Sequence, residues 1–374
     1  MPRASLPNKK TRAARAPRAK AALGVRDLAR STGFSVATIS RVINGADHVA
    51  PETRRQVLAA VAAQGYVPNP AARALSTRRS RTIGAIIPTL AHSIFATFLN
   101  AVERELAGHG YALVIATTGG DPHLEFQRAS DLLDLGAEGL IVTGAVRDKA
   151  FARLIDNRRL PVVATSIYAP SSTVPTIGYD NRALGRLAVQ HLRGLGHENI
   201  AVLHGPLQHH DRTVLRVAGV RAAARGAQLS LIECSLDTAG GVQGARAALC
   251  QRPRPSAILC LSDVLALGAM FEARRAGLAV PRQLSIMGFD DLDWAALCDP
   301  PLTTLHLPTT EMGQLAARAL VGFLDKGLAI VPQRLDAAIV VRQSTAAVGA
   351  STPGGTEQGA LDHQPQLGLH TRAR

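Results

Sequence analysis

The sequence predicts an α/β protein with a small all-α headpiece at its N-terminus, followed by a core of two doubly wound parallel-sheet subdomains. Three observations lead to this prediction. Positive charge is concentrated in the first 81 of the 374 residues, a helix-turn-helix pattern lies within that part, and from residue 82 apolar strands alternate with helices in two consecutive series. A chain of this length, with 47% apolar residues, can bury the cores of two or three domains.

The charge is divided very unevenly along the chain. Residues 1–81 contain 16 Lys and Arg against 3 acidic residues, a net charge of +13, whereas residues 82–374 contain 26 against 25, a net charge of +1. This division is expected of a module that neutralises phosphates beside an almost neutral one. A basic membrane-surface patch is the alternative, but no basic amphipathic helix with aromatic residues supports it. Residues 1–22 are Arg-rich and contain no acid, which predicts a disordered basic arm that adds nonspecific DNA affinity, with a transit peptide as the alternative.

The stretch from Val25 to Gly45 predicts two short helices joined by a tight turn. We expect the first helix at 25–32 and the second at 35–43, with Gly33 in the left-handed conformation that such a turn requires. Apolar residues at helical spacing indicate one buried face, formed by Leu28, Phe34, Ile39 and Val42. A second helix presented in this way fits the major groove of B-DNA, and an ordinary helical hairpin within a core is the alternative.

Two further helical segments complete the N-terminal part. The stretch Pro51–Gly65 predicts a third helix, because Pro suits the first helical position and an apolar stripe follows it. The stretch Ala71–Thr77 can form a helix but is too short to be stable alone in water. We therefore expect a headpiece at 23–68 and a hinge helix with its linker at 69–81.

The remainder of the chain predicts the α/β core. Its strands are continuous apolar runs rather than alternations, which indicates strands buried on both faces of parallel sheets. The expected strands are 83–88, 111–117, 139–144, 161–166, 176–180, 200–205, 229–235, 257–262, 285–290, 302–307 and 336–341. The expected helices are 93–109, 123–135, 148–158, 181–194, 213–226, 239–251, 263–276 and 309–326. Residues 345–374 are rich in Gly, Gln, Thr and Pro and predict a disordered tail.

Several function classes lack their usual sequence signals. The four cysteines form no CxxC pair, so we interpret them as buried apolar residues in a reducing compartment. No apolar run reaches about 18 residues and we see no export signal, so we expect a cytoplasmic protein without a membrane span. Motifs for dinucleotide, P-loop and zinc-protease chemistry are missing, so we expect no enzyme, cofactor or metal. The cluster His204, His209, His210 and Asp211 lacks metal-ligand spacing and favours a mobile loop at the edge of a cleft.

Several motifs together resemble the LacI/GalR family of bacterial transcription regulators. They are GVRDLARSTGFSVATISRVING, APETRRQVLAAVAAQGYVPNPAARAL, RTIGAIIPTL, GFDD and PPLTTLHLP, and the resemblance extends over residues 23–344. It implies a helix-turn-helix headpiece, a hinge helix, and an effector-binding core similar to periplasmic sugar-binding proteins. It also implies a homodimer, in some members a dimer of dimers, that binds a pseudo-palindromic double-stranded operator in the nucleoid.

The resemblance also implies how the core is divided. Subdomain 1 would comprise residues 82–179 and 309–327, and subdomain 2 residues 180–306 and 328–344. The chain would then cross between the subdomains three times, near Asp180, near His306–Pro308 and near Lys326–Ile330.

In this family the first residues of the second helix contact base edges, and the matching positions here are Val36, Ala37 and Arg41. Arg41 can donate two hydrogen bonds to O6 and N7 of a guanine, while Val36 and Ala37 can contact thymine methyl groups. A plain phosphate contact is the alternative for Arg41. Side chains suited to phosphate oxygens are Ser35, Thr38, Ser40 and Asn44.

Residues 69–75, NPAARAL, resemble the hinge helix of the family, in which a leucine wedges between base pairs in the minor groove. Leu75 matches that leucine, and Asn69 and Arg73 are further DNA-binding candidates. Packing of Leu75 against the same residue of a partner, without entry into DNA, is the alternative. Because so short a helix folds only with a partner and DNA, small shifts between the cores could form or melt it.

A ligand of the core is expected between the subdomains, at the carboxyl ends of the strands. The resemblance nominates Phe95, Arg216, Ser262 and Asp290 as effector-binding residues, and Arg212 and Trp294 are added because they lie close to these in the sequence. A ring beside a carboxylate and a guanidinium suits a sugar, and the two arginines together favour a sugar acid. The alternatives are a core position for Phe95, a surface charge for Arg216, a helix cap for Asp290 and a dimer face for Trp294.

The sequence therefore favours a transcription regulator, a repressor whose operator affinity is changed by a small sugar-like effector. A second hypothesis keeps the DNA binding but makes the core a protein-interaction module without a small ligand. A third, a solute-binding transport protein, conflicts with the basic headpiece and with the lack of a recognisable export signal.

Overall fold

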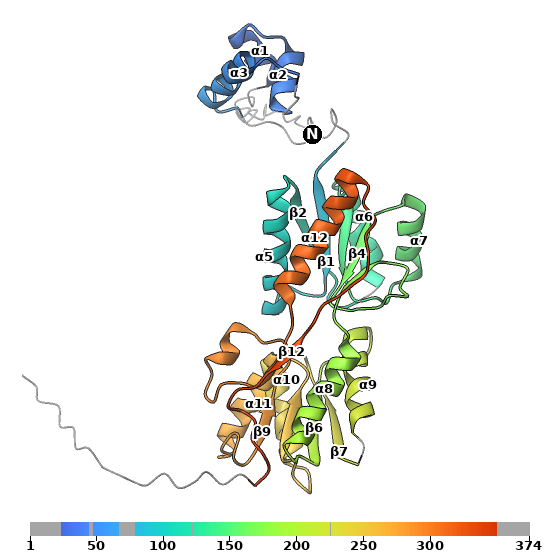
Figure 1. Cartoon of the computed structure of the whole chain (residues 1–374), viewed down its shortest axis with the longest axis vertical. Coiled ribbons are helices and arrows are strands. Elements are labelled where there is room, and N and C mark those ends of the chain that lie inside the picture. Colours follow the sequence, from blue (N-terminus) through green and yellow to red (C-terminus); the bar gives the residue numbers. More distant parts are fainter. Residues whose placement is uncertain (1–23, 45–47, 67–78, 122, 225, 350–374) are drawn as a thin grey trace, which may run out of the picture. The chain divides into compact units, whose positions relative to one another are not determined.

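The computed structural model describes residues 24–44, 48–66, 79–121, 123–224 and 226–349. The chain divides into two compact units, Met1–Ser80 and Arg81–Arg374, which we describe separately (Figure 1). The expected basic arm at 1–22, the hinge candidates Asn69, Arg73 and Leu75, and residues 350–374 of the expected tail lie outside the described residues.

The described part of the first unit consists of three short helices, α1 (Val25–Thr32), α2 (Val36–Ile43) and α3 (Pro51–Ala63). Helix α1 ends at Gly33, whose φ of 75° is the left-handed conformation expected of the turn. The side chains that fill the small core are Leu28, Ile39, Val42, Val57 and Tyr66. The predicted helix-turn-helix is confirmed, with α2 beginning at Val36 because Ser35 is its N-cap.

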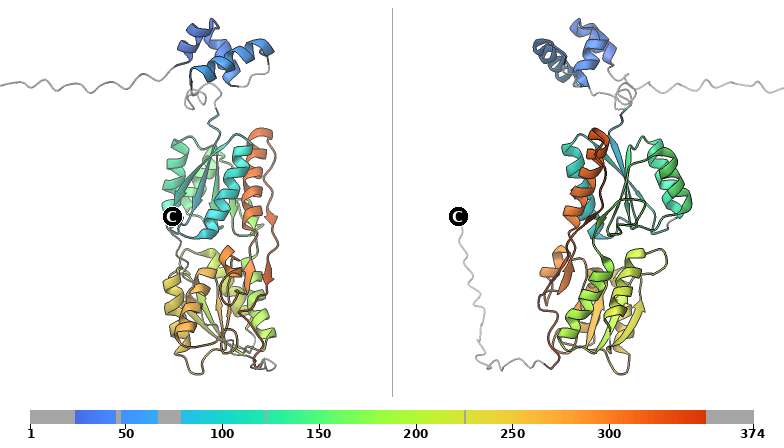
Figure 2. Two further views of the ribbon diagram at one scale, coloured as in Figure 1. Left: turned by 90° about the vertical axis from the view of Figure 1, so that its left-hand side faces the viewer. Right: turned by 45° about the vertical axis from the view of Figure 1, so that its right-hand side comes forward.

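The second unit begins with a parallel sheet in the strand order β11-β5-β4-β3-β1-β2. Its strands are β1 (Thr82–Ile87), β2 (Ala112–Thr117), β3 (Gly139–Thr143), β4 (Val162–Thr165), β5 (Thr176–Gly178) and β11 (Gln333–Arg334). One face carries α5 (Ser93–Gly108) and α12 (Thr309–Lys326), and the other carries α6 (His123–Asp134) and α7 (Lys149–Arg158) (Figure 2). We call this part subdomain 1.

Strand β1 shows why the sheet has helices on both faces. Ile83, Ala85 and Ile87 belong to the core cluster that includes Phe98 and Leu106 of α5. Ile86 points to the opposite face, into the cluster with Leu132 of α6 and Phe151 of α7. Because successive strand residues point to opposite faces, a continuous apolar run supplies both cores.

A second parallel sheet, in the order β7-β6-β8-β9, forms subdomain 2. Its strands are β6 (Asn199–His204), β7 (Gln228–Glu233), β8 (Ala257–Cys260) and β9 (Ser285–Met287). Its helices are α8 (Asn181–Gly194), α9 (Asp211–Ala223), α10 (Thr238–Leu249) and α11 (Asp263–Arg275), and a 3-10 turn, η1 (Asp293–Ala296), follows β9. Helices α8 and α9 share a core with Ile200 and Val202 of β6. Helices α10 and α11 share a second core with Ala201 and Leu203 of the same strand. The predicted fold class, two doubly wound subdomains behind an all-α headpiece, is confirmed.

The last crossing between the subdomains differs from the expectation. The segment from residue 328, expected in subdomain 2, still contributes β11 to the first sheet, where Gln333 pairs with Ile177 and Arg334 with Gly178. The chain crosses only after β11, and β12 (Ala338–Val340) then pairs antiparallel with β10 (Thr304–His306). The expected tail also differs at its start, because Ala346 donates to Ser285 Oγ and Val348 to the Leu195 carbonyl. Residues 345–348 are therefore fastened to subdomain 2.

Candidate functional site

In the headpiece, α2 presents a distinct outer face. Val36, Ala37 and Arg41 are exposed, whereas Ile39 and Val42 are buried against α1 and α3. This is the arrangement that the sequence predicted for residues that contact base edges. An exposed arginine beside two small apolar side chains can form bidentate hydrogen bonds to guanine and apolar contacts to thymine.

The candidate phosphate-binding side chains lie around this face and already have partners within the helix. Ser35 Oγ accepts the N–H of Thr38 at 3.1 Å, and the two hydroxyls lie 2.9 Å apart. Asn44 Nδ2 donates to Ser40 Oγ at 3.3 Å. A hydroxyl can donate and accept at once, so these contacts leave capacity for a phosphate oxygen while they fix the start and end of α2.

In the second unit, a cleft lies between the two subdomains, at the carboxyl ends of β1, β6 and β8. We use "the cleft" for the space lined by the following residues: His92, Ser93, Ile94, Phe95, Phe98, Ser166, Tyr179, Gly205, His210, Arg212, Thr213, Arg216, Leu236, Leu261, Ser262, Val264, Asp290, Leu292, Thr309 and Met312. It is a cavity of about 90 Å³. This position corresponds to the switch point of a doubly wound sheet, where ligands usually bind.

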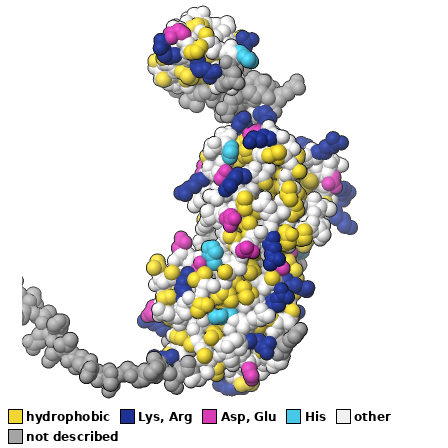
Figure 3. Space-filling model, viewed as in Figure 1, with side chains coloured by type: hydrophobic (Ala, Val, Ile, Leu, Met, Phe, Trp, Pro, Cys, Tyr) yellow, Lys and Arg dark blue, Asp and Glu magenta, His cyan; other side chains and the backbone are white. Residues whose placement is uncertain are grey.

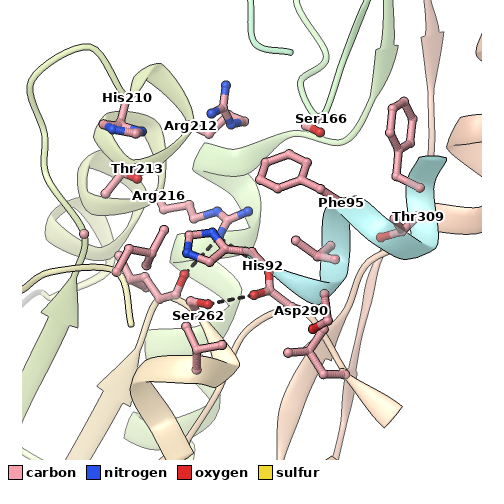
Figure 4. A pocket seen from close by; sticks show the side chains of 18 of the residues that line it. His92, Phe95, Ser166, His210, Arg212, Thr213, Arg216, Ser262, Asp290 and Thr309 are labelled. Carbon is pink, nitrogen blue, oxygen red and sulfur yellow. Dashed lines mark hydrogen bonds and ion pairs between the residues drawn. The ribbon is translucent and has the colours of Figure 1, made fainter. Parts of the chain in front are cut away.

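The structure brings five of the six predicted effector-binding residues to this cleft. These five are Phe95, Arg212, Arg216, Ser262 and Asp290. Figure 4 shows the ring of Phe95 and the guanidinium of Arg216 pointing toward the same space, with Ser262 and Asp290 joined by a hydrogen bond nearby. The apolar ring comes from subdomain 1 and the polar groups come from subdomain 2.

Arg216, on α9, is the buried cation of the cleft. Its Nε donates to Asn181 Oδ1 and its Nη1 to the carbonyl of Leu261, both at 2.9 Å. Its guanidinium also lies 3.8 Å from the centroid of the Phe289 ring. Burial lowers the pKa of Arg216, an effect that the charges of Tyr179 and Asp290 oppose. These partners hold the guanidinium of Arg216 in one orientation, in which it points toward the space for the ligand.

Asp290, after β9, is the buried acid of the cleft. Its Oδ2 accepts from Ser262 Oγ at 2.8 Å, and its Oδ1 lies 3.9 Å from Arg216 Nη1. Burial raises its pKa to about 7; Asp263 adds to this rise, and Arg216 opposes it. Near neutral pH the carboxyl can therefore accept a hydrogen bond from a ligand hydroxyl or, when protonated, donate one.

The backbone that carries Asp290 is strained and is supported by Asp263. Asp290 has a φ of 131°, which side chains rarely adopt. The fully buried carboxylate of Asp263 accepts from Phe289 N at 2.8 Å, Leu292 N at 2.9 Å and Thr304 Oγ1 at 2.6 Å. Burial raises the pKa of Asp263 as well. This carboxylate is structural, because it fixes the turn on which Asp290 stands.

Trp294 is not brought to the cleft with the other five. It lies on η1, packs against the second core of subdomain 2, and lines an adjoining groove that shares Asp290 and Thr309 with the cleft. Asp290 and Asp291 have positive φ values, and Leu292 still lines the cleft before η1 begins. A role of Trp294 in effector binding therefore stays a prediction.

Several residues that line the cleft were not predicted as effector-binding residues. They are His92, Ser166, Tyr179, His210, Thr213 and Thr309. Tyr179 and Thr309 stand at two of the crossings between subdomains, and those crossings were expected near residues 180 and 306–308. Tyr179 and Thr309 could therefore have been found from their place beside these crossings, because segments that cross between the subdomains line the cleft.

The charges of the core are balanced, as the sequence indicated. Figure 3 shows acidic and basic side chains interspersed over much of its visible face.

Among the described residues, no group of His, Cys, Asp or Glu is arranged to hold a metal ion. Within the same residues, no helix is both long and apolar enough to cross a membrane.

Comparisons with known proteins agree with this arrangement of two units. The family described as "Bacterial regulatory proteins, lacI family" matches residues 25–69, and the family described as "Periplasmic binding protein-like domain" matches residues 189–345. The ribose operon repressor of Haemophilus influenzae is 35% identical over 304 residues, 79% of this chain and 90% of that protein.

Two solved structures extend the likeness to three dimensions. The lac repressor dimer bound to operator and the anti-inducer ONPF has a TM-score of 0.78 and 28% identity, over 87% of this chain and 100% of that one. The complex of the regulator CelR with cellobiose has a TM-score of 0.63 and 29% identity, over 86% of this chain and 99% of that one.

Proposed function

Because the chain belongs to the LacI family of bacterial regulatory proteins, we propose that it is a sequence-specific DNA-binding transcription regulator, a repressor. Its operator affinity changes when a small effector, a sugar or sugar acid, binds in the cleft. Among its relatives are a ribose operon repressor and a regulator in complex with cellobiose. The observation that carries the proposal is the pairing, in one chain, of an exposed recognition-helix face with a polar cleft built around Arg216 and Asp290.

We assign DNA binding to residues 23–68, a hinge to 69–81, and effector binding and dimerisation to the core from residue 82. Arg41 reads a guanine and Leu75 opens the operator centre, while the small residues of α2 contact thymine methyl groups. The protein acts as a homodimer on a pseudo-palindromic double-stranded operator. The lac repressor to which it is similar is also a dimer bound to operator. It works in the cytoplasm on nucleoid DNA and catalyses no reaction.

The cleft suits a polyhydroxylated ligand for a physical reason. A sugar offers a CH face for the Phe95 ring and hydroxyls that both donate and accept hydrogen bonds. Arg216 can only donate, whereas Asp290 can accept, so the two together recognise a pair of neighbouring hydroxyls. Arg212 adds a second donor at the rim, which favours a ligand that also bears an acidic group.

The test begins with selection of DNA from a randomised duplex library by the full-length protein. We expect enrichment of a sequence with two related half-sites. Its affinity is then measured with and without ribose, cellobiose, gluconate and glucuronate, and we expect at least one of these to change it. A library that yields no enriched sequence would overturn DNA recognition. Enrichment with an affinity that no sugar, sugar acid or cell metabolite alters would favour a protein-interaction core.

A further inference from the structure

One edge of the cleft is bridged by hydrogen bonds between the two subdomains. Asp211, the first residue of α9 in subdomain 2, accepts the N–H of Ala145 at 2.6 Å and of Val146 at 3.2 Å through Oδ2. Both amides belong to the loop that follows β3 in subdomain 1. The other oxygen, Oδ1, accepts from Arg212, from the backbone N–H at 2.8 Å and from Nη1 at 3.0 Å. A single carboxylate thus joins subdomain 1 to the arginine at the rim of the cleft.

The loop that receives this carboxylate is held in place by Arg147. Its Nη1 donates to the carbonyls of Thr143 at 3.3 Å and Val146 at 2.9 Å, and its Nη2 donates to the carbonyl of Gly144. Glu125 on α6 pairs with the same guanidinium at 3.2 Å, and both side chains are only 8% exposed. With the carbonyls of the loop bound to Arg147, its amides are left to face the opposite subdomain. Successive amides held in this way form a fixed anion-binding site.

The fit around Asp211 is close on both sides. Gly144 has a φ of 79°, and a Cβ there would lie 2.5 Å from Arg212 Nη1 and 2.7 Å from Asp211 Oδ1. A Cβ on Gly120, in the loop after β2, would lie 3.0 Å from the His210 ring. The loop between β6 and α9 and the first residues of α9 therefore lie directly against two loops of subdomain 1, and both contacts depend on glycine.

The contact is also largely screened from water. The side chains of Asp211 and Arg212 are 13% and 15% exposed. A hydrogen bond to an ionised acceptor is stronger than one between neutral groups, and a low local dielectric strengthens it further. The bond between Asp211 and the loop amides is therefore of the strong kind.

We propose that Asp211 is a clasp that keeps this edge of the cleft closed before any effector binds. The carboxylate of subdomain 2 occupies the amide site of subdomain 1, and in doing so it also positions Arg212 toward the ligand space. The effector then enters a cleft that is already shaped at this edge. The role concerns the core, and it is tested without DNA or effector, so its outcome is separate from that of the proposed function.

Hydrogen exchange of the full-length protein, without effector, measures the clasp directly. In the wild type we expect slow exchange in three segments at this edge, 118–121, 143–147 and 205–210. Replacing Asp211 with Ala (Asp211→Ala) should accelerate exchange in all three by about tenfold or more. The variant lacks the carboxylate that binds the amides of the loop after β3, so this edge of the cleft opens more often. Asp211→Asn retains an oxygen acceptor without the charge and should give an intermediate rate.

The matched control is Asp237→Ala. Asp237 also accepts a backbone N–H at the start of a helix of subdomain 2, that of Gly240 at 2.6 Å, but it is not one of the residues that line the cleft. The Asp237→Ala variant should leave hydrogen exchange in the three segments at wild-type rates. Slow exchange of strand β6 in every variant will show that the fold is intact. Unchanged rates in Asp211→Asn and Asp211→Ala, or acceleration limited to 143–147, would overturn the clasp, since the edge would then stay closed without it.

Discussion

Arg41 is the exposed charge on the face of α2 that also carries Val36 and Ala37. Replacing it with Ala removes the bidentate donor while leaving the buried face of the helix intact. We expect a loss of about 1–3 kcal/mol in binding to the selected operator and a much smaller loss on random DNA. Titrations of both DNAs at one salt concentration measure the difference. Arg30→Ala, on α1 and paired with Asp27, serves as the control and should leave the ratio unchanged. Equal losses on both DNAs would make Arg41 a phosphate contact.

Asp290 should make stability depend on pH in a definite direction. Its pKa rises from 3.8 to about 7 on folding, so the folded chain retains a proton that the unfolded chain releases. The contribution to stability is full below the unfolded pKa and is lost as pH rises through about 7. The groups that face the carboxyl are Arg216, Asp263 and Ser262, and of these Arg216 and, to a smaller extent, Ser262 limit the rise of the pKa.

The Asp290→Asn variant removes this titration. We therefore expect the melting temperature of the wild type to fall, relative to that of the variant, from about pH 4 to about pH 7. Asp293→Asn changes an exposed carboxyl three residues away and should retain the wild-type profile. Parallel profiles of wild type and Asp290→Asn would mean that folding does not raise the pKa of Asp290.

For single residues, the sequence predicted which side chains reach the cleft better than it predicted their backbone conformation and hydrogen-bond partners. The positions of Arg216 and Asp290 were predicted by resemblance, and both reach the cleft. The φ of 131° at Asp290 was not predictable, because Asp263, 27 residues earlier in the chain, supports the turn through hydrogen bonds. Trp294 was assigned to the effector site because it closely follows Asp290 in the sequence, and that role stays a prediction.

Among the elements, the pair α8 and α9 decides where Arg216 lies. The helices meet through glycines on both sides. A Cβ on Gly219 would lie 1.9 Å from the carbonyl oxygen of Arg182, and one on Gly185 would lie 2.1 Å from that of Arg216 itself. The two backbones approach so closely that no side chain fits between them, and this approach brings Arg216 within reach of Asn181.

Replacing Gly219 with Ala should therefore force the two helices apart. We expect a destabilisation of about 1–3 kcal/mol, the usual range for overpacking, and weaker effector binding because Arg216 moves. Urea unfolding and ligand titration measure the two effects. The control is Gly194→Ala at the end of α8, where a Cβ meets nothing within 4 Å; it should be neutral or stabilising by about 0.5–1 kcal/mol. Equal stability of the two variants would contradict this account of the helix pair.

Elements with a strong sequence pattern were predicted well, and weak ones were not. The buried strands of both sheets show continuous apolar runs and were identified by them. Strand β11 has two residues and no pattern, so the last crossing was placed too early. The bonds from Asp211 to residues 145 and 146 connect positions about 65 apart in sequence, and no local pattern encodes them.

The division of the whole molecule into two units separates two kinds of chemistry. Positive charge and the recognition-helix face belong to the first unit, and the almost neutral second unit holds the cleft. With one arginine and two small apolar residues on α2, a single headpiece offers few base contacts. Specificity in the proposed repressor therefore depends on two headpieces reading two half-sites at a fixed spacing.

This dependence can be tested on the DNA. In the selected operator, insertion of about 5 base pairs between the half-sites turns one of them to the opposite side of the duplex. A dimer whose headpieces are tied to two joined cores cannot reach both, so we expect affinity to fall to that of a single half-site, by about tenfold or more. The control replaces the same number of central base pairs without changing the spacing. If the inserted and original operators bind equally well, each headpiece reads its half-site independently, and the cores exert no control over the distance between the two recognition helices.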